Sequence, residues 1–359
     1  MLIILTILLS CILFLVVVLL VISPGKVKPF LDENGKPLVG SISEKIHVNI
    51  NGVEQGMFIR GKVATNPVLL YLHGGMPDYF LTQKYPTGLE DYFTVVWWEQ
   101  RGSGLSYSPG IPPGSMALEQ MISDAREVTD YLRKRFGQVK IYLMGHSGGT
   151  FIGIRVAALF PEMYHAYIGV SQMSDQLKSE RLAYEYMLKQ YQKNGNAKMV
   201  QKLEEAPVTD GTPAKYLQLR DKAMHQLGVG TTREMSSVIT GIFLPSLTCR
   251  EYTLGEKINM WRGKSNSGVS SLWGGMLKTN LIDKVSELDI PVYFFEGAYD
   301  YTVSYTLAKE YFEKLQAPIK GFYTFERSAH SPLFEEPEKM QLILREDVLR
   351  AANNLADSK

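Results

Sequence analysis

The chain has 359 residues, too many for one minimal domain and enough for one large domain with an insertion. Hydrophobic residues make up 45% and charged residues 21%, which is ordinary for a globular protein with a core. Lys and Arg together number 38, Asp and Glu 37, and the formal net charge is +1. This balance gives no sign of a nucleic-acid or other polyanion partner.

The first segment, residues 2–22, contains no charged residue. Because a bilayer crossing needs about 20 apolar residues, residues 1–25 are predicted to form a single-pass N-terminal transmembrane anchor. The alternative is a cleaved or lipidated signal segment, but no Lys or Arg precedes the run and it continues well past Cys11. Lys26 and Lys28 are too weak a bias to fix the side of the membrane.

The next elements predict a sheet. Asn51-Gly52 separates strand-like segments 45–50 and 53–60, and this dipeptide favours a hairpin because both central turn positions need positive φ. Six apolar runs then alternate with helical stretches, the pattern of a parallel sheet covered on both faces. We therefore expect an α/β fold with eight mostly parallel strands. The six runs are Val68–Leu72, Thr94–Trp98, 140–144, 166–170, 292–295 and 321–325.

Strand signals disappear between residues 175 and 275, where segments 180–193 and 197–205 are typical of amphipathic helices. We predict a helical cap over residues 175–275, lying on the C-terminal edge of the sheet, where open α/β sheets bind ligands. The core then has two parts, 26–174 and 276–359. The acidic residues of the cap are candidates for holding an ammonium group, although their plain interpretation is a solvated helix face. They include Glu180, Glu185, Glu204 and Glu205.

Gly145-His146-Ser147-Gly148-Gly149 fits the G-x-S-x-G pattern of a nucleophile elbow. The pentapeptide alone is a weak signal, and its context strengthens it. A buried strand precedes it and a helix over 150–160 follows it, as an elbow requires. The sequence therefore predicts Ser147 as a nucleophile, projecting at a helix N-terminus.

A serine nucleophile needs a base, and the base needs a carboxylate. Of the six histidines, His330 follows the last strand in a loop of small residues, which favours it as the base. Asp300 follows the strand at 292–295 and completes the chain order Ser, Asp, His of this fold. Glu296 is the rival acid, but it lies at the strand end, before the turn.

The oxyanion hole of such a site uses the N–H after the nucleophile and one from the loop after the third strand. The first is that of Gly148. His73-Gly74-Gly75 follows the strand Val68–Leu72, so Gly75 is the expected second donor, with Gly74 in reserve. His73 is expected to orient this loop rather than to move protons.

Together these segments resemble the prolyl iminopeptidase group of α/β-hydrolases. The resemblance runs from about residue 45 to 345 and leaves out the N-terminal segment. It is carried by His73-Gly74-Gly75, Glu99-Gln100-Arg101-Gly102-Ser103-Gly104-Leu105-Ser106, Gly145 to Gly149, Gly297 to Asp300, and Ala329-His330-Ser331. The resemblance implies a helical cap and release of N-terminal residues from short peptides.

The chain departs from the group at three positions. Met76 stands in place of a proline, Gly148 in place of an aromatic residue, and Tyr301 in place of a glutamate that holds the substrate amine in some members. The expected function is a serine hydrolase of aminopeptidase type, acting on a short peptide or small acyl substrate without metal or organic cofactor. The alternatives are a membrane-anchored esterase or lipase-like hydrolase and, more distantly, a non-catalytic binding protein. The oligomeric state stays open.

Overall fold

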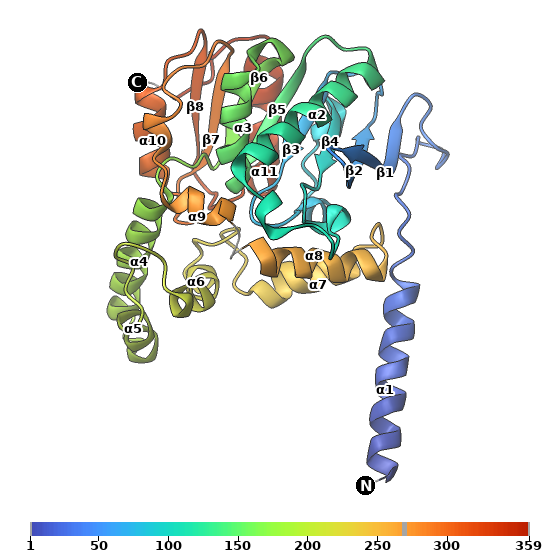
Figure 1. Ribbon diagram of the computed structural model, residues 1–359, viewed down its shortest axis with the longest axis vertical. Coiled ribbons are helices and arrows are strands. Elements are labelled where there is room, and N and C mark those ends of the chain that lie inside the picture. The colour runs from blue at the N-terminus through green and yellow to red at the C-terminus, as the bar shows by residue number, and fades with distance from the viewer. Residues whose placement is uncertain (1, 268–270, 358–359) are drawn as a thin grey trace.

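The computed structural model describes residues 2–267 and 271–357, and one eight-stranded sheet organises them (Figure 1). The strand order is β1-β2-β4-β3-β5-β6-β7-β8; β2 is antiparallel to both β1 and β4, and the strands from β4 to β8 are parallel. The predicted fold class is confirmed. The strands are β1 (Ile42–Ile50), β2 (Val53–Gly61), β3 (Val68–Leu72), β4 (Thr94–Trp98), β5 (Ile141–His146), β6 (Tyr164–Val170), β7 (Val292–Gly297) and β8 (Lys320–Phe325).

The central strands are apolar because both faces of the sheet are covered. β3 and β4 are buried at every position, and neighbouring residues such as Trp97 and Trp98 join opposite apolar layers. One layer packs under α2, α3 and α10, and the other under α11 and α12. These helices are α2 (Leu118–Phe136), α3 (Gly148–Leu159), α10 (Tyr305–Lys314), α11 (Pro332–Glu335) and α12 (Pro337–Ile343).

The described residues between β6 and β7 form helices and loops without a strand of the sheet, and we call this segment, 176–277, the cap. Figure 1 shows it below the end of the sheet at which the parallel strands finish. The prediction of a solvated face is wrong for Glu180, which is fully buried, but Glu185, Glu204 and Glu205 are exposed. The cap holds α4 (Gln176–Lys193), α5 (Ala197–Glu204), α6 (Ala214–Gln226), η6 (Ile239–Phe243), α7 (Leu244–Thr248), α8 (Leu254–Ser267) and α9 (Ser271–Leu277).

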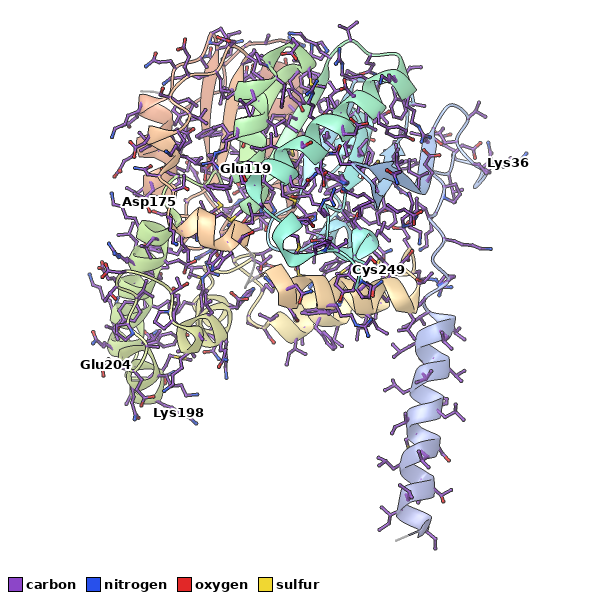
Figure 2. The ribbon with its side chains drawn as sticks, in the orientation of Figure 1. Lys36, Glu119, Asp175, Lys198, Glu204 and Cys249 are labelled. Carbon is purple, nitrogen blue, oxygen red and sulfur yellow. The ribbon has the colours of Figure 1, made fainter. Side chains whose placement is uncertain are left out.

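The N-terminal helix α1 (Leu2–Val21) stands apart from the rest of the chain. Its window Ile3–Val21 has a mean hydropathy of 3.4 and none of it is buried, so α1 is long and apolar enough to cross a membrane. In Figure 2 its side chains project outward along its length, with no other element beside most of it.

Candidate active site

Ser147 occupies a strained turn between β5 and α3. Its backbone has φ 54° and ψ −124°, a conformation that non-glycine residues rarely adopt. The backbone approaches its neighbours closely at two glycines of this turn. A Cβ atom on Gly149 would lie 2.1 Å from the Leu72 carbonyl oxygen, and one on Gly145 would lie 2.8 Å from the Gly149 carbonyl oxygen, so both positions require glycine. The helix begins at Gly148, two residues before the predicted start, so the Gly148 N–H belongs to the first turn, which has no intrahelical acceptor.

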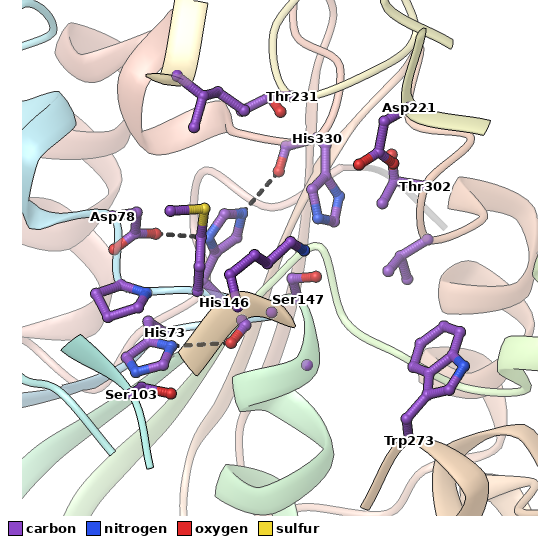
Figure 3. A pocket seen from close by; sticks show the side chains of 18 of the residues that line it. His73, Asp78, Ser103, His146, Ser147, Asp221, Thr231, Trp273, Thr302 and His330 are labelled. Carbon is purple, nitrogen blue, oxygen red and sulfur yellow. Dashed lines mark hydrogen bonds and ion pairs between the residues drawn. The ribbon is translucent and has the colours of Figure 1, made fainter. Parts of the chain in front are cut away.

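The loop after β3 lies against the nucleophile. A side chain on Gly74 would come within 2.8 Å of Ser147 Cβ and 3.1 Å of Ser147 Oγ, so only glycine allows this approach. His73, Gly74, Gly75, Ser147 and Gly148 all line one cavity (Figure 3). The structure thus brings the predicted oxyanion residues to the side of the serine.

His73 and Gln100 hold the oxyanion loop in place. The His73 Nδ1 atom lies 2.8 Å from the Gly74 carbonyl oxygen, and its Nε2 accepts the Gln100 N–H at 3.1 Å. The Gln100 side chain donates to the His73 carbonyl at 2.8 Å. These partners require a neutral His73 with the proton on Nδ1, and burial lowers the pKa of this histidine in the same direction. His73 therefore contacts the loop through its ring and its backbone.

His330, which lines the same cavity as Ser147, pairs with Asp300. His330 Nδ1 lies 2.8 Å from Asp300 Oδ2, while Asp300 Oδ1 accepts the N–H groups of Thr302 and Val303 at 2.8 and 2.9 Å. Burial lowers the pKa of His330, although Asp300 opposes that shift, and the ring is neutral at pH 7. A neutral imidazole whose Nδ1–H is bound by a carboxylate leaves Nε2 as the basic atom.

Glu296, the rival acid, lies elsewhere. It is fully buried at the end of β7, its Oε1 accepts the Gln172 N–H at 2.8 Å, and Oε2 has no hydrogen-bond partner. Burial raises the pKa of Glu296 well above its usual range. Only Asp300 of the two carries a hydrogen bond to His330.

A second histidine, His146, packs beside the base. Its Nδ1 lies 3.1 Å from Asp78 Oδ2 and its Nε2 lies 2.8 Å from the His330 carbonyl oxygen (Figure 3). Both partners are acceptors, so both nitrogens are donors and the ring is an imidazolium. Burial lowers the pKa of His146, but the hydrogen bond and charge of Asp78 raise it by more. The rings of His146 and His330 are 5.0 Å apart.

The cavity over Ser147 has a volume of about 460 Å³, and cap residues form much of its wall. Most of the lining is apolar, but α6 contributes Arg220 and Asp221 and α8 contributes Lys264. The Arg220 guanidinium donates to buried Glu180 at 2.7 Å and to Asp221 at 3.1 Å. Burial raises the pKa of Asp221, but Arg220 and Lys264 lower it by more. Asp221 is therefore ionised, with half of its side chain exposed.

The sequence predicted none of these polar cap residues. Asp221 and Lys264 are ordinary charged residues in amphipathic helices, and nothing in their spacing marks them. Their place in the cavity depends on how α6 and α8 dock on the sheet. Asp78 lies only three residues beyond Gly75, so proximity to the oxyanion loop was the one usable signal.

Comparison with known proteins identifies the family to which the chain belongs. The family described as alpha/beta hydrolase fold matches residues 67–337. The chain belongs to the alpha/beta hydrolase fold family. A curated relative, the probable aminopeptidase YbaC of Bacillus subtilis (strain 168), is 32% identical over 301 residues, which cover 83% of this chain and 93% of that protein.

Solved structures agree on the fold. A proline iminopeptidase from Mycobacterium smegmatis superposes with a TM-score of 0.61 at 14% identity, covering 86% of this chain and 98% of that one. VinJ superposes with a TM-score of 0.60 at 17% identity, with the same coverage. The resemblance to the prolyl iminopeptidase group is confirmed. This alpha/beta hydrolase is similar to proteins of peptidase type, while its substrate and its catalytic residues remain matters for proposal.

Proposed function

We propose that the protein is a serine hydrolase with Ser147 as nucleophile, His330 as base and Asp300 as the supporting acid. One observation carries the proposal: His330, paired with buried Asp300, lines the same cavity as a serine held on a strained elbow. His330 Nε2 takes the hydroxyl proton as Ser147 Oγ attacks the substrate carbonyl carbon. His330 then returns that proton to the leaving group, and an acyl-enzyme forms. Water, deprotonated by His330, attacks the acyl-enzyme and releases Ser147.

The N–H groups of Gly75 and Gly148 stabilise the negative oxygen of each tetrahedral intermediate. Donors of this kind contribute about 2.7–4 kcal/mol each to the transition state. Asp300 stabilises the imidazolium that forms on His330 and keeps its proton on Nδ1. The scheme uses side chains and backbone alone.

The proposed substrates are short peptides with a free N-terminus, in keeping with the aminopeptidase name of the curated relative. An exopeptidase has to recognise an ammonium group, and a semi-buried ammonium needs a carboxylate because an unpaired buried charge is costly. Asp221 fits that role. It is ionised, half exposed and on the wall of the cavity that holds Ser147. Tyr301, in place of the glutamate of some relatives, instead stacks on Tyr186 of the cap at 3.8 Å.

The test is the specificity constant, kcat/KM, for prolyl β-naphthylamide against its N-acetylated form, with p-nitrophenyl butyrate alongside. The free amine should be preferred by about 10²-fold or more, because the acetylated substrate has no ammonium group to bind Asp221. Equal rates for the two amides, with fast ester turnover, would remove the aminopeptidase proposal.

The second candidate is an esterase of small acyl substrates. It is favoured by the mostly apolar lining of the cavity and by Arg220 and Lys264, which partly neutralise Asp221. An acyl ester needs no ammonium site, so neutralising Asp221 would leave its turnover unchanged. The butyrate ester in the same assay separates the two candidates.

We further propose that α1 is an uncleaved membrane anchor. Its length and hydropathy suit a crossing, and its outer side chains lack packing partners among the described residues. The full-length protein should remain with membranes after alkaline carbonate extraction. A mature N-terminus near residue 25, found by mass spectrometry, would instead identify a cleaved signal.

A further inference from the structure

The residues that follow α1 form hydrogen bonds with the cap. Lys257 of α8 is fully buried, and its ammonium donates to Ser23 Oγ at 2.7 Å, to the Ile22 carbonyl at 3.4 Å and to the Leu247 carbonyl of α7 at 2.7 Å. A cation at this position also offsets the negative C-terminal end of α1. α1, α7 and α8 therefore meet at one ammonium group.

The next residues strengthen that joint. Pro24 forms an isolated β-bridge with Thr253, and the Gly25 N–H donates to the Arg250 carbonyl at 3.1 Å. The chain leaves the apolar helix and immediately contacts the α7–α8 connection. In Figure 1, α7 and α8 lie at the same end of the molecule from which α1 projects.

Four apolar side chains are exposed on this part of the cap. They are Ile239 at 63%, Phe243 at 38%, Leu244 at 47% and Ile258 at 46% of their full surface, and we call them the cap patch. Ile239 and Phe243 are four residues apart on η6, Leu244 follows Phe243, and the Phe243 ring packs edge-on against Trp261 at 5.2 Å. Trp261 is three residues beyond Ile258 on α8.

The same helices are apolar on their inner face as well. Val238, Ile242 and Trp261 line the cavity over Ser147. A surface helix normally shows the solvent a polar face, so a helix with two apolar faces implies an apolar environment on each side. The cavity is one of these environments, and the other lies outside the cap.

We propose that the cap patch rests on the lipid bilayer that holds α1, with the substrate cavity directly behind it. The inference rests on the proposed anchoring of α1. If α1 spans the bilayer, Ile22 and Ser23 lie at its surface, and the α7–α8 residues bonded to them lie in the same layer. Phe243 and Trp261 are residue types that favour this interface, where apolar helix faces are buried about 5–10 Å deep.

The charges beside the cap patch suit lipid headgroups. Lys26, Arg250 and Arg262 are exposed, whereas the two acids of the α7–α8 region, Glu251 and Glu256, form ion pairs within the protein. Glu256 pairs with Lys45 at 2.8 Å and Glu251 with Arg60 at 3.5 Å. The exposed charges of the α1 junction and of α7 and α8 are therefore positive, which favours anionic lipids, and Glu234, before η6, is an exposed acid. A cap patch that rests on the bilayer gives peptides or acyl compounds at the membrane surface a short path to Ser147.

The test places an environment-sensitive fluorophore on the full chain in lipid nanodiscs. Cys11→Ser removes the exposed cysteine, and Cys249 is buried, so a cysteine introduced by Ile239→Cys is the labelling site. Val139→Cys is the matched control. Val139 is 77% exposed and precedes β5, at the N-terminal end of the parallel strands, whereas the cap lies at their C-terminal end. A third sample carries the label on native Cys11.

Two kinds of quencher are compared: lipids with a nitroxide near the headgroup or near the end of the acyl chain, which reach labels at the surface and at the bilayer centre, and iodide in the water. The proposal expects lipid quenching at position 239 several-fold stronger than at 139, and weaker iodide quenching. If position 239 behaves like 139 while Cys11 is quenched by lipid, the anchor stands and the proposal falls. If Cys11 is not quenched either, the anchoring itself is wrong. Shielding of 239 from iodide without lipid quenching would identify a second protein surface as the occupant and would overturn the proposal.

Discussion

The core and the cap build one cavity in different ways. In the core, each functional side chain follows directly from a strand end, and local contacts set its direction, as Gly149 and Gly74 do for Ser147. In the cap, Asp221 and Lys264 reach the same cavity only because whole helices dock over the sheet. Core positions are thus fixed by a few neighbouring residues, and cap positions by packing over the length of a helix. The chemistry should depend on the first and the choice of substrate on the second.

The strongest test of this division is Ser147→Ala. We expect turnover to fall by about 10⁴-fold or more with folding intact, as in other Ser-His-Asp enzymes. A fluorophosphonate probe should label the parent and not the variant. Ser103→Ala, which removes another hydroxyl from the cavity wall, should keep the label. Labelling that persists in Ser147→Ala would show that another serine is the nucleophile.

Gly74→Ala tests whether close packing in the core sets the reaction rate. The added methyl group would come within 2.8 Å of Ser147 Cβ, so the oxyanion loop has to shift. We expect kcat to fall by about 10²–10³-fold, the effect of losing one oxyanion donor, with KM changed little. Gly75→Ala is the matched comparison, because its methyl group meets only the mobile end of Lys264 at 3.3 Å. Equal losses in the two variants would contradict this explanation.

These cases show why sequence patterns point to candidate residues in the core and not to the polar residues that the cap adds to the cavity. The motif around Ser147, the strand before it and the helix after it are contiguous, so one short segment carries the whole elbow. His330 and Asp300 are predicted because this fold places its base and acid after particular strands. Glu180 was expected on a solvated face, yet it is buried against Arg220, forty residues away. Such a pair depends on how α4 meets α6, and helical periodicity contains no information on that.

Asp221→Asn carries the comparison into the cap. Loss of this charge should reduce kcat/KM for prolyl β-naphthylamide by about 10²-fold and leave the N-acetylated substrate unchanged. Asp210→Asn is the control, because Asp210 is a fully exposed cap acid that pairs with Arg181 away from the cavity. A parallel loss on both substrates would assign Asp221 to the packing of the cap. No loss on either would favour the esterase candidate.

The smallest expected effect comes from His146, which is in the core but acts only through its charge. Several charged groups influence His330: Asp300 from the loop after β7, Arg220 from the cap and His146 from the end of β5. Burial lowers the pKa of His330, and the His146 imidazolium and Arg220 lower it further. His146→Asn removes one of these cations and leaves Asp78 behind with its negative charge. Both changes favour the protonated form of His330, so its pKa should rise.

The base has to be unprotonated to react. The acid limb of the pH profile of kcat/KM should therefore move to higher pH in His146→Asn, by about one unit for a charge at the distance between the His146 and His330 rings. Glu335 also titrates in this range, since burial raises its pKa to about 7, but it is present in both proteins and cancels from the difference. His165→Asn, which replaces an exposed histidine of β6, should not move the limb. If the acid limb of the kcat/KM profile does not move while kcat falls, His146 acts by positioning the His330 loop. It would do so through its Nε2 contact with the His330 carbonyl, and not through its charge.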